Sequence, residues 1–233
     1  MKVLFEDDFI LVCEKPAGIS TQAGKVTEKD MISEVNNYMR KAGAKAPAYI
    51  IHRLDKPVRG IIVFAKTKEA AAKLSSQVVA KDNNGFEKKY YAIVEGIIEN
   101  KEGVLENYMY KDGNSAVIVN AIPSSDHEIT SKNGGYIKAS EVKLARLSYN
   151  VVEEKHSNNN DISTHMCKID INLHTGRFHQ IRAQLSSIGH PIVGDTAYGS
   201  VVPYEKRKAI GLIAYSLSFT HPVTKKRMHF ELE

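Results

Sequence analysis

The sequence predicts an α+β fold, in which a large mixed and mostly antiparallel β-sheet carries a few helices. Short apolar or alternating runs, rich in β-branched and aromatic residues, recur along the 233 residues with turn residues between them. Apolar residues at helical spacing occur in only a few segments. The sequence shows no internal repeat, low-complexity tract or obvious linker. We therefore expect one continuous domain over residues 1–233, with room for two lobes.

The first third of the chain predicts strands and two helices. "VLFEDDFILVCEK" gives two short β-type runs, and Pro16 and Gly18 close the second. "DMISEVNNYMRKAG" has helical spacing and ends at Gly43. "GIIVFAKT" is a continuous apolar run typical of a buried strand. Thr67 can cap the helix that "KEAAAKLSSQVVA" predicts.

The rest of the chain is dominated by predicted strands. "KKYYAIVEGII" is one strand, and "ENYMYKDGNSAVIVNAI" reads as a hairpin around Asp112 and Gly113. "SEVKLARLSYNVVEE" and "HMCKIDINL" alternate apolar and polar residues on either side of a predicted loop at residues 156–164. "FHQIRAQLSSIG" predicts a short helix ended by Gly189. "GLIAYSLSF" and "RMHFELE" predict a last hairpin.

Composition sets broad limits on location and partners. The formal net charge of +5 and the pI of about 9.0 suit a nucleic-acid partner without requiring one. Cys13 and Cys167 lie in apolar strand-like runs, so we expect reduced core residues. No apolar run approaches the ~18 residues of a membrane span, and the N-terminus has acids where a signal peptide needs apolar residues. We therefore expect a cytoplasmic protein with no membrane contact.

The segment "IHRLDKPVRG", residues 51–60, places a carboxylate between two apolar stretches. Asp55 follows a short apolar run, on a turn marked by Pro57 and Gly60. Arg53 and Lys56 are cationic neighbours that keep a carboxylate ionised, as a nucleophile or general base requires. By themselves these residues also fit an ordinary surface turn.

The segment around the last predicted helix is rich in arginine. Arg182 lies at the edge of the helix's apolar face, His179 nearly opposite that face, and Arg177 before the helix. The planar fork of arginine suits phosphate and carboxylate groups. An amphipathic helix with solvated bases is the alternative. The residues expected to face the core are Ile181, Leu185 and Ile188.

The strand "EKKYYAIVEG" carries two adjacent tyrosines. Tyr90 and Tyr91 point to opposite faces, because side chains alternate along a strand. One of them can therefore reach a site while the other packs elsewhere.

Together these segments resemble a known family. "HRLDKPVRGIIVFAKT", "KKYYAIVEG" and "GRFHQIRAQLSSIGHPIVGDTAYG" are similar to the three signature blocks of RluA-type RNA pseudouridine synthases. "EKPAGIST" resembles that family's Lys-Pro-Ala-Gly segment, and "LIAYSLSFTHPVTKKRMHF" its closing hairpin. The matches run from about residue 3 to residue 230 in family order. The resemblance implies a pseudouridine synthase-like catalytic domain with a central cleft.

The resemblance also implies roles for individual residues. Asp55 would be the essential catalytic carboxylate, Arg182 would lie against it, and Tyr90 would stack under the target uracil. Many relatives have serine before the glycine of the first block, where this chain has Arg59. Some relatives carry a small RNA-binding domain before the catalytic one, and we expect none here. The basic residues expected to contact RNA are Arg53, Arg59, Lys66, Arg177 and His179.

The implied reaction is isomerisation of uridine to pseudouridine in ribosomal or transfer RNA. The N1–C1′ bond breaks, the uracil turns, and C5 bonds to C1′, so no cofactor or metal is required. Asp55 can attack C1′ or C6, or remove the 2′ proton to give a glycal, and the sequence does not choose. The target uridine would be flipped out of a loop or stem-loop by a monomeric enzyme.

Two other classes of function are weighed against this one. A metal-dependent nuclease could use the histidines, but no spacing typical of metal ligands is present. A non-catalytic RNA-binding module could retain the fold, although an intact set of Asp55, Tyr90 and Arg182 argues against it. The histidines in question are His52, His174, His179 and His190.

Overall fold

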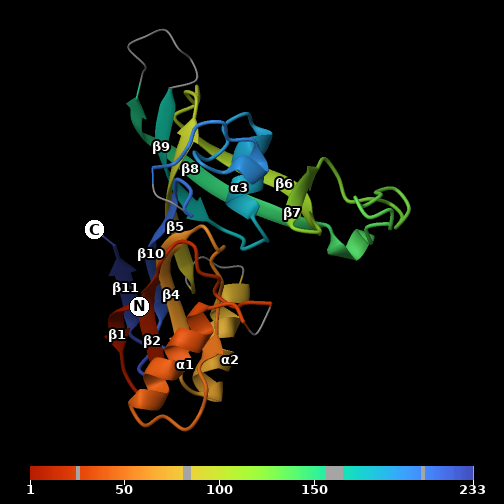
Figure 1. The fold of residues 1–233 in the computed structure, drawn as a ribbon. Helices are drawn as coiled ribbons and strands as arrows, with labels where there is room; N and C mark the ends of the chain where they lie inside the picture. The colour runs from red at the N-terminus through yellow and green to blue at the C-terminus, as the bar shows by residue number, and fades with distance from the viewer. Residues whose placement is uncertain (25–26, 81–84, 156–164, 206–207, 233) are drawn as a thin grey trace. The chain divides into compact units, whose positions relative to one another are not determined.

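A computed structural model describes residues 1–24, 27–80, 85–155, 165–205 and 208–232 (Figure 1). The chain divides into two compact units, the first made of residues 1–90 and 206–233 and the second of residues 91–205. The loop predicted at residues 156–164 lies outside the described residues. Among the described residues, no helix is both long and apolar enough to cross a membrane.

The first unit is built on a mixed sheet. Its strands follow the order β1-β2-β4-β10, with β3 beside β4 and β11 beside β10. The pairing of β4 with β10 is parallel, and the pairings of β1 with β2, β2 with β4, β3 with β4 and β10 with β11 are antiparallel. The strands span Lys2–Glu6 (β1), Ile10–Lys15 (β2), Tyr49–Ile50 (β3), Arg59–Ala65 (β4), Leu212–Thr220 (β10) and Arg227–Glu231 (β11).

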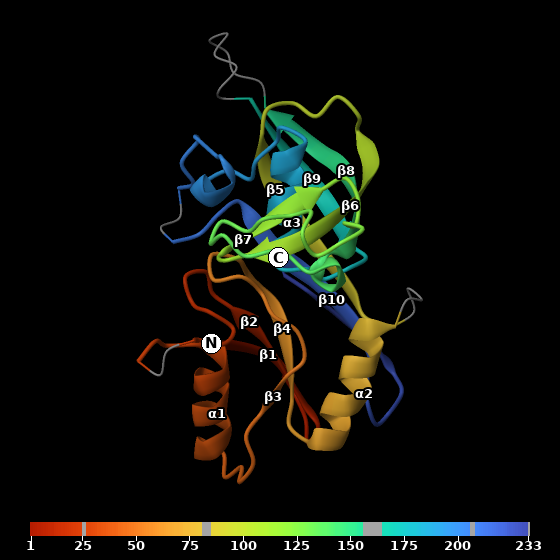
Figure 2. The same ribbon diagram turned by 90° about the vertical axis from the view of Figure 1, so that its right-hand side faces the viewer.

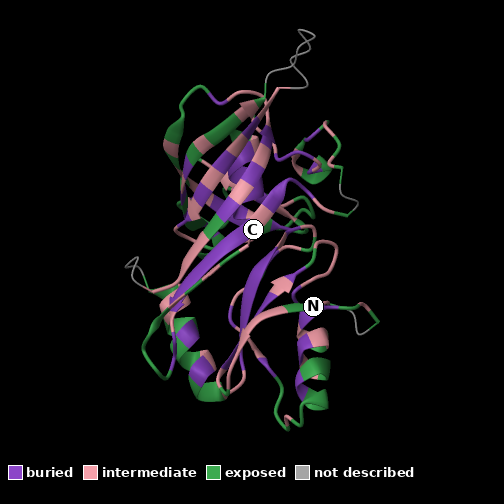
Figure 3. Ribbon diagram, turned by 90° about the vertical axis from the view of Figure 1, so that its left-hand side faces the viewer, coloured by how far each residue is buried: buried purple, intermediate pink, exposed green. Residues whose placement is uncertain are grey.

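Two helices cover this sheet (Figure 2). The helix α1 spans Met31–Lys41 and α2 spans Lys68–Val79, with Thr67 capping α2 as predicted. Successive residues of β2 belong to different hydrophobic clusters. Leu11 shares a cluster with residues of α1, and Val12 shares one with residues of α2. The two helices therefore bury opposite faces of the sheet. Figure 3 shows buried residues along the strands and on one side of each helix.

Gly60 is required by the way β4 meets β10. Its φ is +154°, and it is paired with Ala214 in the parallel register. A Cβ added to Gly60 would lie 2.4 Å from both the Cβ and the carbonyl oxygen of Ala214. The glycine that ends the "HRLDKPVRG" segment thus lets two backbones approach closely beside the turn of Asp55.

The second unit is an antiparallel sheet with one described α-helix. Here β6 pairs with β7 and with β8, and β8 pairs with β9. The predicted hairpin around Asp112 and Gly113 forms between β6 and β7. The elements span Glu102–Asp112 (β6), Ser115–Val119 (β7), Lys143–Lys155 (β8), Met166–Leu173 (β9) and Gln180–Ser187 (α3).

The strand β5, Glu87–Glu95, runs from the first unit into the second, with the boundary after Tyr90. Cys13 and Cys167 are free and buried, as predicted. The predicted fold class, a mixed and mostly antiparallel sheet with few helices, is confirmed.

Candidate active site

Asp55 lies on a tight turn whose backbone is fixed from both sides. The amide of Val58 donates to the carbonyl of Asp55 at 3.0 Å, which closes the turn. Before Asp55, the buried hydroxyl of Thr21 donates to the carbonyl of Leu54 and accepts from its amide, both at 3.0 Å. The half-buried carboxylate of Asp55 thus stands on a backbone with little freedom to move.

The residue after Asp55 is held by a second loop. The carbonyl of Lys56 accepts from the amide of Gly18 at 2.7 Å and from the Nζ of Lys15 at 3.3 Å. The same Nζ donates to the carbonyls of Pro16 at 3.0 Å and Ile19 at 2.7 Å. The "EKPAG" segment is therefore anchored to the turn of Asp55 by the Lys15 side chain and the Gly18 amide.

Lys15 is fully buried, with no exposed area, so its charge matters to the turn. Burial lowers the pKa of Lys15 from 10.5 to about 8, and the carboxylate of Asp55 acts in the opposite direction. Lys15 lies in the "EKPAGIST" segment that resembles the family, but it was not predicted as a site residue.

Lys15 makes the stability depend on pH in a defined direction. Between about pH 8 and about pH 10, Lys15 is neutral in the folded protein and protonated in the unfolded chain. Unfolding then takes up a proton, so this group makes the free energy of unfolding rise with pH. We expect a larger rise in wild type than in Lys15→Met when urea unfolding is measured at about pH 7.5 and about pH 9.5. Equal changes in the two proteins would contradict the assignment.

Tyr90 is buried close to the charge of Asp55. Only 6% of its surface is exposed. Burial raises the pKa of Tyr90 above its usual range, and the carboxylate of Asp55 raises this pKa further. The phenol therefore stays protonated at neutral pH, which leaves it an aromatic surface and a hydroxyl donor. Tyr91 is half-buried, and the Nζ of Lys168 lies over its ring, 4.3 Å from the ring centroid. The two tyrosines therefore have different surroundings.

His52 offers little to a metal ion. Its Nε2 accepts from the amide of Val63 at 3.2 Å, and burial lowers the pKa of His52 to about 3. Its ring packs edge-on against Phe86, with the centroids 5.2 Å apart. Within the part of the chain that the structure describes, no three His, Cys, Asp or Glu side chains gather as a ligand set. The nuclease alternative thus finds no observation in its favour.

In the second unit, Arg182 forms a buried two-point ion pair with Asp195. The Nε of Arg182 donates to Oδ2 of Asp195 at 2.6 Å, and a terminal nitrogen donates to Oδ1 at 2.8 Å. The two side chains are 7% and 2% exposed. The guanidinium also lies 4.8 Å from the ring centroid of Tyr198. Asp195 was missed in the sequence analysis, although it lies in the quoted "GHPIVGDTAYG" block.

The helix α3 is more deeply buried than its sequence predicted. Ile181 and Leu185 are buried as expected, but Ile188 is 38% exposed because it caps the end of the helix. Arg182 is 6% exposed, so the alternative of an amphipathic helix with solvated bases does not hold for this residue. The left-handed backbone of His179, with φ of 51°, begins α3.

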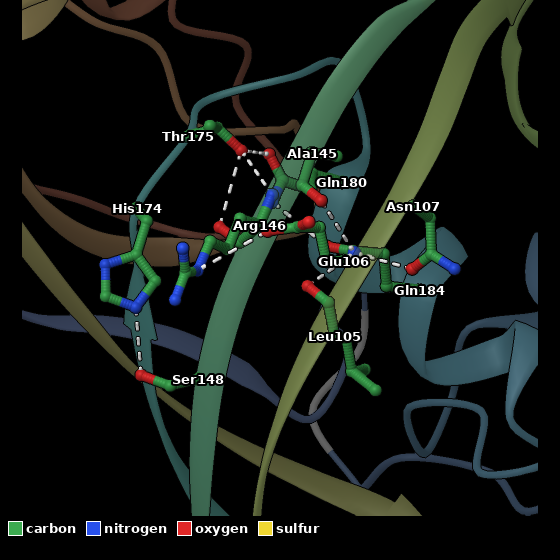
Figure 4. Close-up of polar contacts among 10 residues, drawn as sticks. All are labelled: Leu105, Glu106, Asn107, Ala145, Arg146, Ser148, His174, Thr175, Gln180 and Gln184. Carbon is green, nitrogen blue, oxygen red and sulfur yellow. Dashed lines mark hydrogen bonds and ion pairs between the residues drawn. The ribbon is translucent and has the colours of Figure 1, made fainter. Parts of the chain in front are cut away.

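A chain of buried polar side chains ties α3 to the sheet (Figure 4). Gln180 accepts from the hydroxyl of Thr175 at 2.8 Å and donates to Gln184 at 3.0 Å. Gln184 in turn donates to the carbonyl of Leu105 at 3.1 Å and to the side chain of Asn107 at 2.8 Å. Because buried amides are costly to leave unpaired, these bonds fix the rotation of α3 and with it the direction of Arg182.

Comparison with known proteins gives the family. Residues 9–187 match the sequence profile described as RNA pseudouridylate synthase. The chain belongs to the RNA pseudouridylate synthase family. The family and the enzyme class predicted from the sequence are thereby confirmed.

Individual relatives of this family extend the comparison. The chain is 31% identical over 230 residues to ribosomal large subunit pseudouridine synthase D of Nitrosomonas europaea, covering 95% of this chain but only 58% of that protein. It is 26% identical to tRNA pseudouridine synthase C of Vibrio cholerae, covering 97% of this chain and 88% of that protein. The solved human RNA pseudouridylate synthase domain containing 4 has the same fold, with a TM-score of 0.72 at 19% identity, covering 100% of this chain and 88% of that one.

The basic residues predicted to contact RNA differ in their surroundings. Arg53 is exposed, whereas Arg59 is paired with Glu14. Lys66 donates to Glu6 at 2.8 Å and to the carbonyl of Asp7 at 2.6 Å.

The two predicted RNA contacts of the second unit also have protein partners. The Nε of the exposed Arg177 donates to the carbonyl of Leu144 at 2.9 Å. The ring of His179 stacks on Phe178, and its Nδ1 lies 3.0 Å from the hydroxyl of Tyr198. RNA contact by these residues and by the three bases of the first unit stays a prediction.

Proposed function

We propose that the protein converts specific uridines in ribosomal or transfer RNA to pseudouridine, with Asp55 as the catalytic carboxylate and with Tyr90 and Arg182 as further catalytic residues. The observation that carries this proposal is the arrangement in the first unit. There the turn that carries Asp55 is held by hydrogen bonds from Val58, Thr21, Gly18 and Lys15, and the Asp55 carboxylate acts to raise the pKa of two buried groups, Tyr90 and Lys15. The names of the relatives, which include enzymes of ribosomal and transfer RNA, support the substrate class.

Each proposed residue has a chemical task. Asp55 attacks the sugar or the base, or removes the 2′ proton, so that the N1–C1′ bond breaks and C5 can bond to C1′. Tyr90, held as a neutral phenol, offers a ring for stacking and a hydroxyl near the uracil edge. Arg182, aligned by Asp195, supplies a positive charge with a fixed direction. The target base leaves its stack first, at a cost of a few kcal/mol that favours loops.

The organisation of the whole protein is part of the same proposal. We infer one catalytic domain that comprises both compact units and acts as a monomer in the cytoplasm. The two free, buried cysteines suit a reducing compartment.

The test is direct. Pseudouridines are mapped in the ribosomal and transfer RNA of a strain lacking this gene and of the same strain carrying wild type or Asp55→Asn. A position lost in the deletion strain and regained only with wild type identifies the substrate uridine. If no position changes while the purified protein still binds RNA, the non-catalytic alternative replaces this proposal.

The isomerisation should proceed in excess EDTA. Nothing is oxidised and no group is added, so the carboxylate mechanism needs no Lewis acid. We expect equal conversion of uridine in bulk RNA with and without chelator, with monovalent salt maintaining the RNA fold. Loss of activity that only a transition metal restores would contradict the metal-free mechanism.

A further inference from the structure

The turn of Asp55 borders a cavity that none of the roles above uses. Its volume is about 350 Å³, and it is lined by Gly18, Lys56, Pro57 and Lys208. All four residues belong to the first unit. Lys56 follows Asp55 directly in the chain, so the cavity opens beside the catalytic turn.

The geometry points to a binding site for one phosphate of the RNA backbone, held between the ammonium groups of Lys56 and Lys208, next to the target nucleotide. That the ligand is RNA rests on the proposed function. It adds two residues, Lys56 and Lys208, that neither the sequence analysis nor the catalytic set assigned to RNA.

The wall of the cavity is rigid. The carbonyl of Lys56 receives bonds from Lys15 and from the amide of Gly18, so the loop carrying Gly18 and the turn carrying Lys56 are fixed to each other. Pro57 restricts the backbone further. Because this backbone is fixed, binding an anion has to order only the Lys56 side chain and not the loop that carries it.

Gly18 and Lys208 approach each other closely. Gly18 has φ of +84°, and a Cβ built on it would lie 3.2 Å from the Cβ of Lys208. Lys208 itself has a left-handed backbone, with φ of 63°, which is uncommon for a residue with a side chain. Strained backbone of this kind is concentrated at functional sites. The Lys208 side chain runs along Gly18 and lines the cavity.

The charges of the two lysines are available to an anion. The Nζ of Lys56 is paired with Glu28, but the two side chains are 55% and 37% exposed, and such exposed pairs contribute little to stability. Lys208 is exposed and has no ion pair with any residue that the structure describes. A phosphate can therefore displace Glu28 at low cost and bridge the two ammonium groups. Lysine is suited to this because it binds phosphate as a point charge.

Salt dependence of binding tests the site. The probe is a nine-residue oligouridylate, and its affinity is measured against salt for wild type, Lys208→Ala, Lys208→Arg and Lys73→Ala. Lys73 is an exposed lysine of α2 in the same unit and serves as the matched control. Because each phosphate contact on a single strand contributes about 0.7 to the slope of log affinity against log salt, we expect Lys208→Ala to lose about that amount. Lys208→Arg and Lys73→Ala should keep the wild-type slope.

The outcomes separate this site from the proposed function. An unchanged slope in Lys208→Ala, an equal loss in Lys73→Ala, or no salt-dependent binding by wild type overturns the phosphate site. Conversion of uridine in bulk RNA is measured in parallel on the same proteins. If wild type converts no uridine, the proposed function fails even though the salt slopes can still support an anion site. If wild type is active and the slopes do not differ, only the phosphate site is wrong.

Discussion

Asp55→Asn should make no detectable pseudouridine and should still fold and bind RNA. Asparagine keeps the size of the side chain and much of its hydrogen bonding, but it lacks the negative charge and the nucleophilic oxygen. The turn itself is held by backbone hydrogen bonds and by the side chains of Thr21 and Lys15, which Asp55→Asn leaves in place. The loss should therefore appear in the chemical step.

The measurement is single-turnover conversion at saturating enzyme, with RNA binding measured separately. The pKa of Tyr90 provides a second readout, because the Asp55 carboxylate contributes to its elevation. Removing that charge should lower the pKa of Tyr90 in a pH titration of tyrosine absorbance, and Tyr90→Phe identifies the signal. A folded Asp55→Asn that converts uridine at close to the wild-type rate would mean that the motif is only a turn.

Asp195→Leu should cost about 3–5 kcal/mol of stability, because it removes a partner of a buried guanidinium. The double variant Arg182→Met with Asp195→Leu removes both charges and fills the site with apolar side chains. We expect it to regain most of the lost stability, since replacing a whole buried ion pair is often close to neutral. Urea unfolding of wild type, both single variants and the double variant measures this coupling.

Activity of the same variants separates structural from catalytic roles of Arg182. If Arg182 takes part in the reaction, the double variant should be inactive even where its stability is close to wild type. A stable double variant that converts uridine normally would show that Arg182 only maintains the fold of the second unit. Asp195→Leu alone should also lose activity, because Arg182 is then no longer aligned.

Local sequence signals accounted for the elements of the fold. Thr67 caps the start of α2 as predicted, and its hydroxyl oxygen accepts from the amide of Ala70. This cap could be predicted because both partners are close together in the sequence. The hairpin at Asp112 and the opposite placement of Tyr90 and Tyr91 follow from turn chemistry and from the two-residue period of a strand. The family blocks added the roles of Asp55, Tyr90 and Arg182, which periodicity alone does not supply.

The tertiary structure decided which polar side chains are buried. Arg182 was expected at the edge of an apolar face, but its burial depends on Asp195, which is 13 residues away and brought close only by the fold. Gln184 is buried because β6 and β8 supply its hydrogen-bond partners, and Gln180 is buried because it donates to Gln184.

The role of Lys15 shows the same limit at the catalytic turn. By itself, the sequence determined the strands, the helices and the carboxylate on its turn, because these follow from residues adjacent in the chain. Only the tertiary structure placed the Lys15 ammonium on the carbonyl of Lys56, 41 residues away. A buried charge is tolerated only where distant carbonyls and a carboxylate compensate for its lost hydration, and the local sequence does not specify which distant groups will meet it.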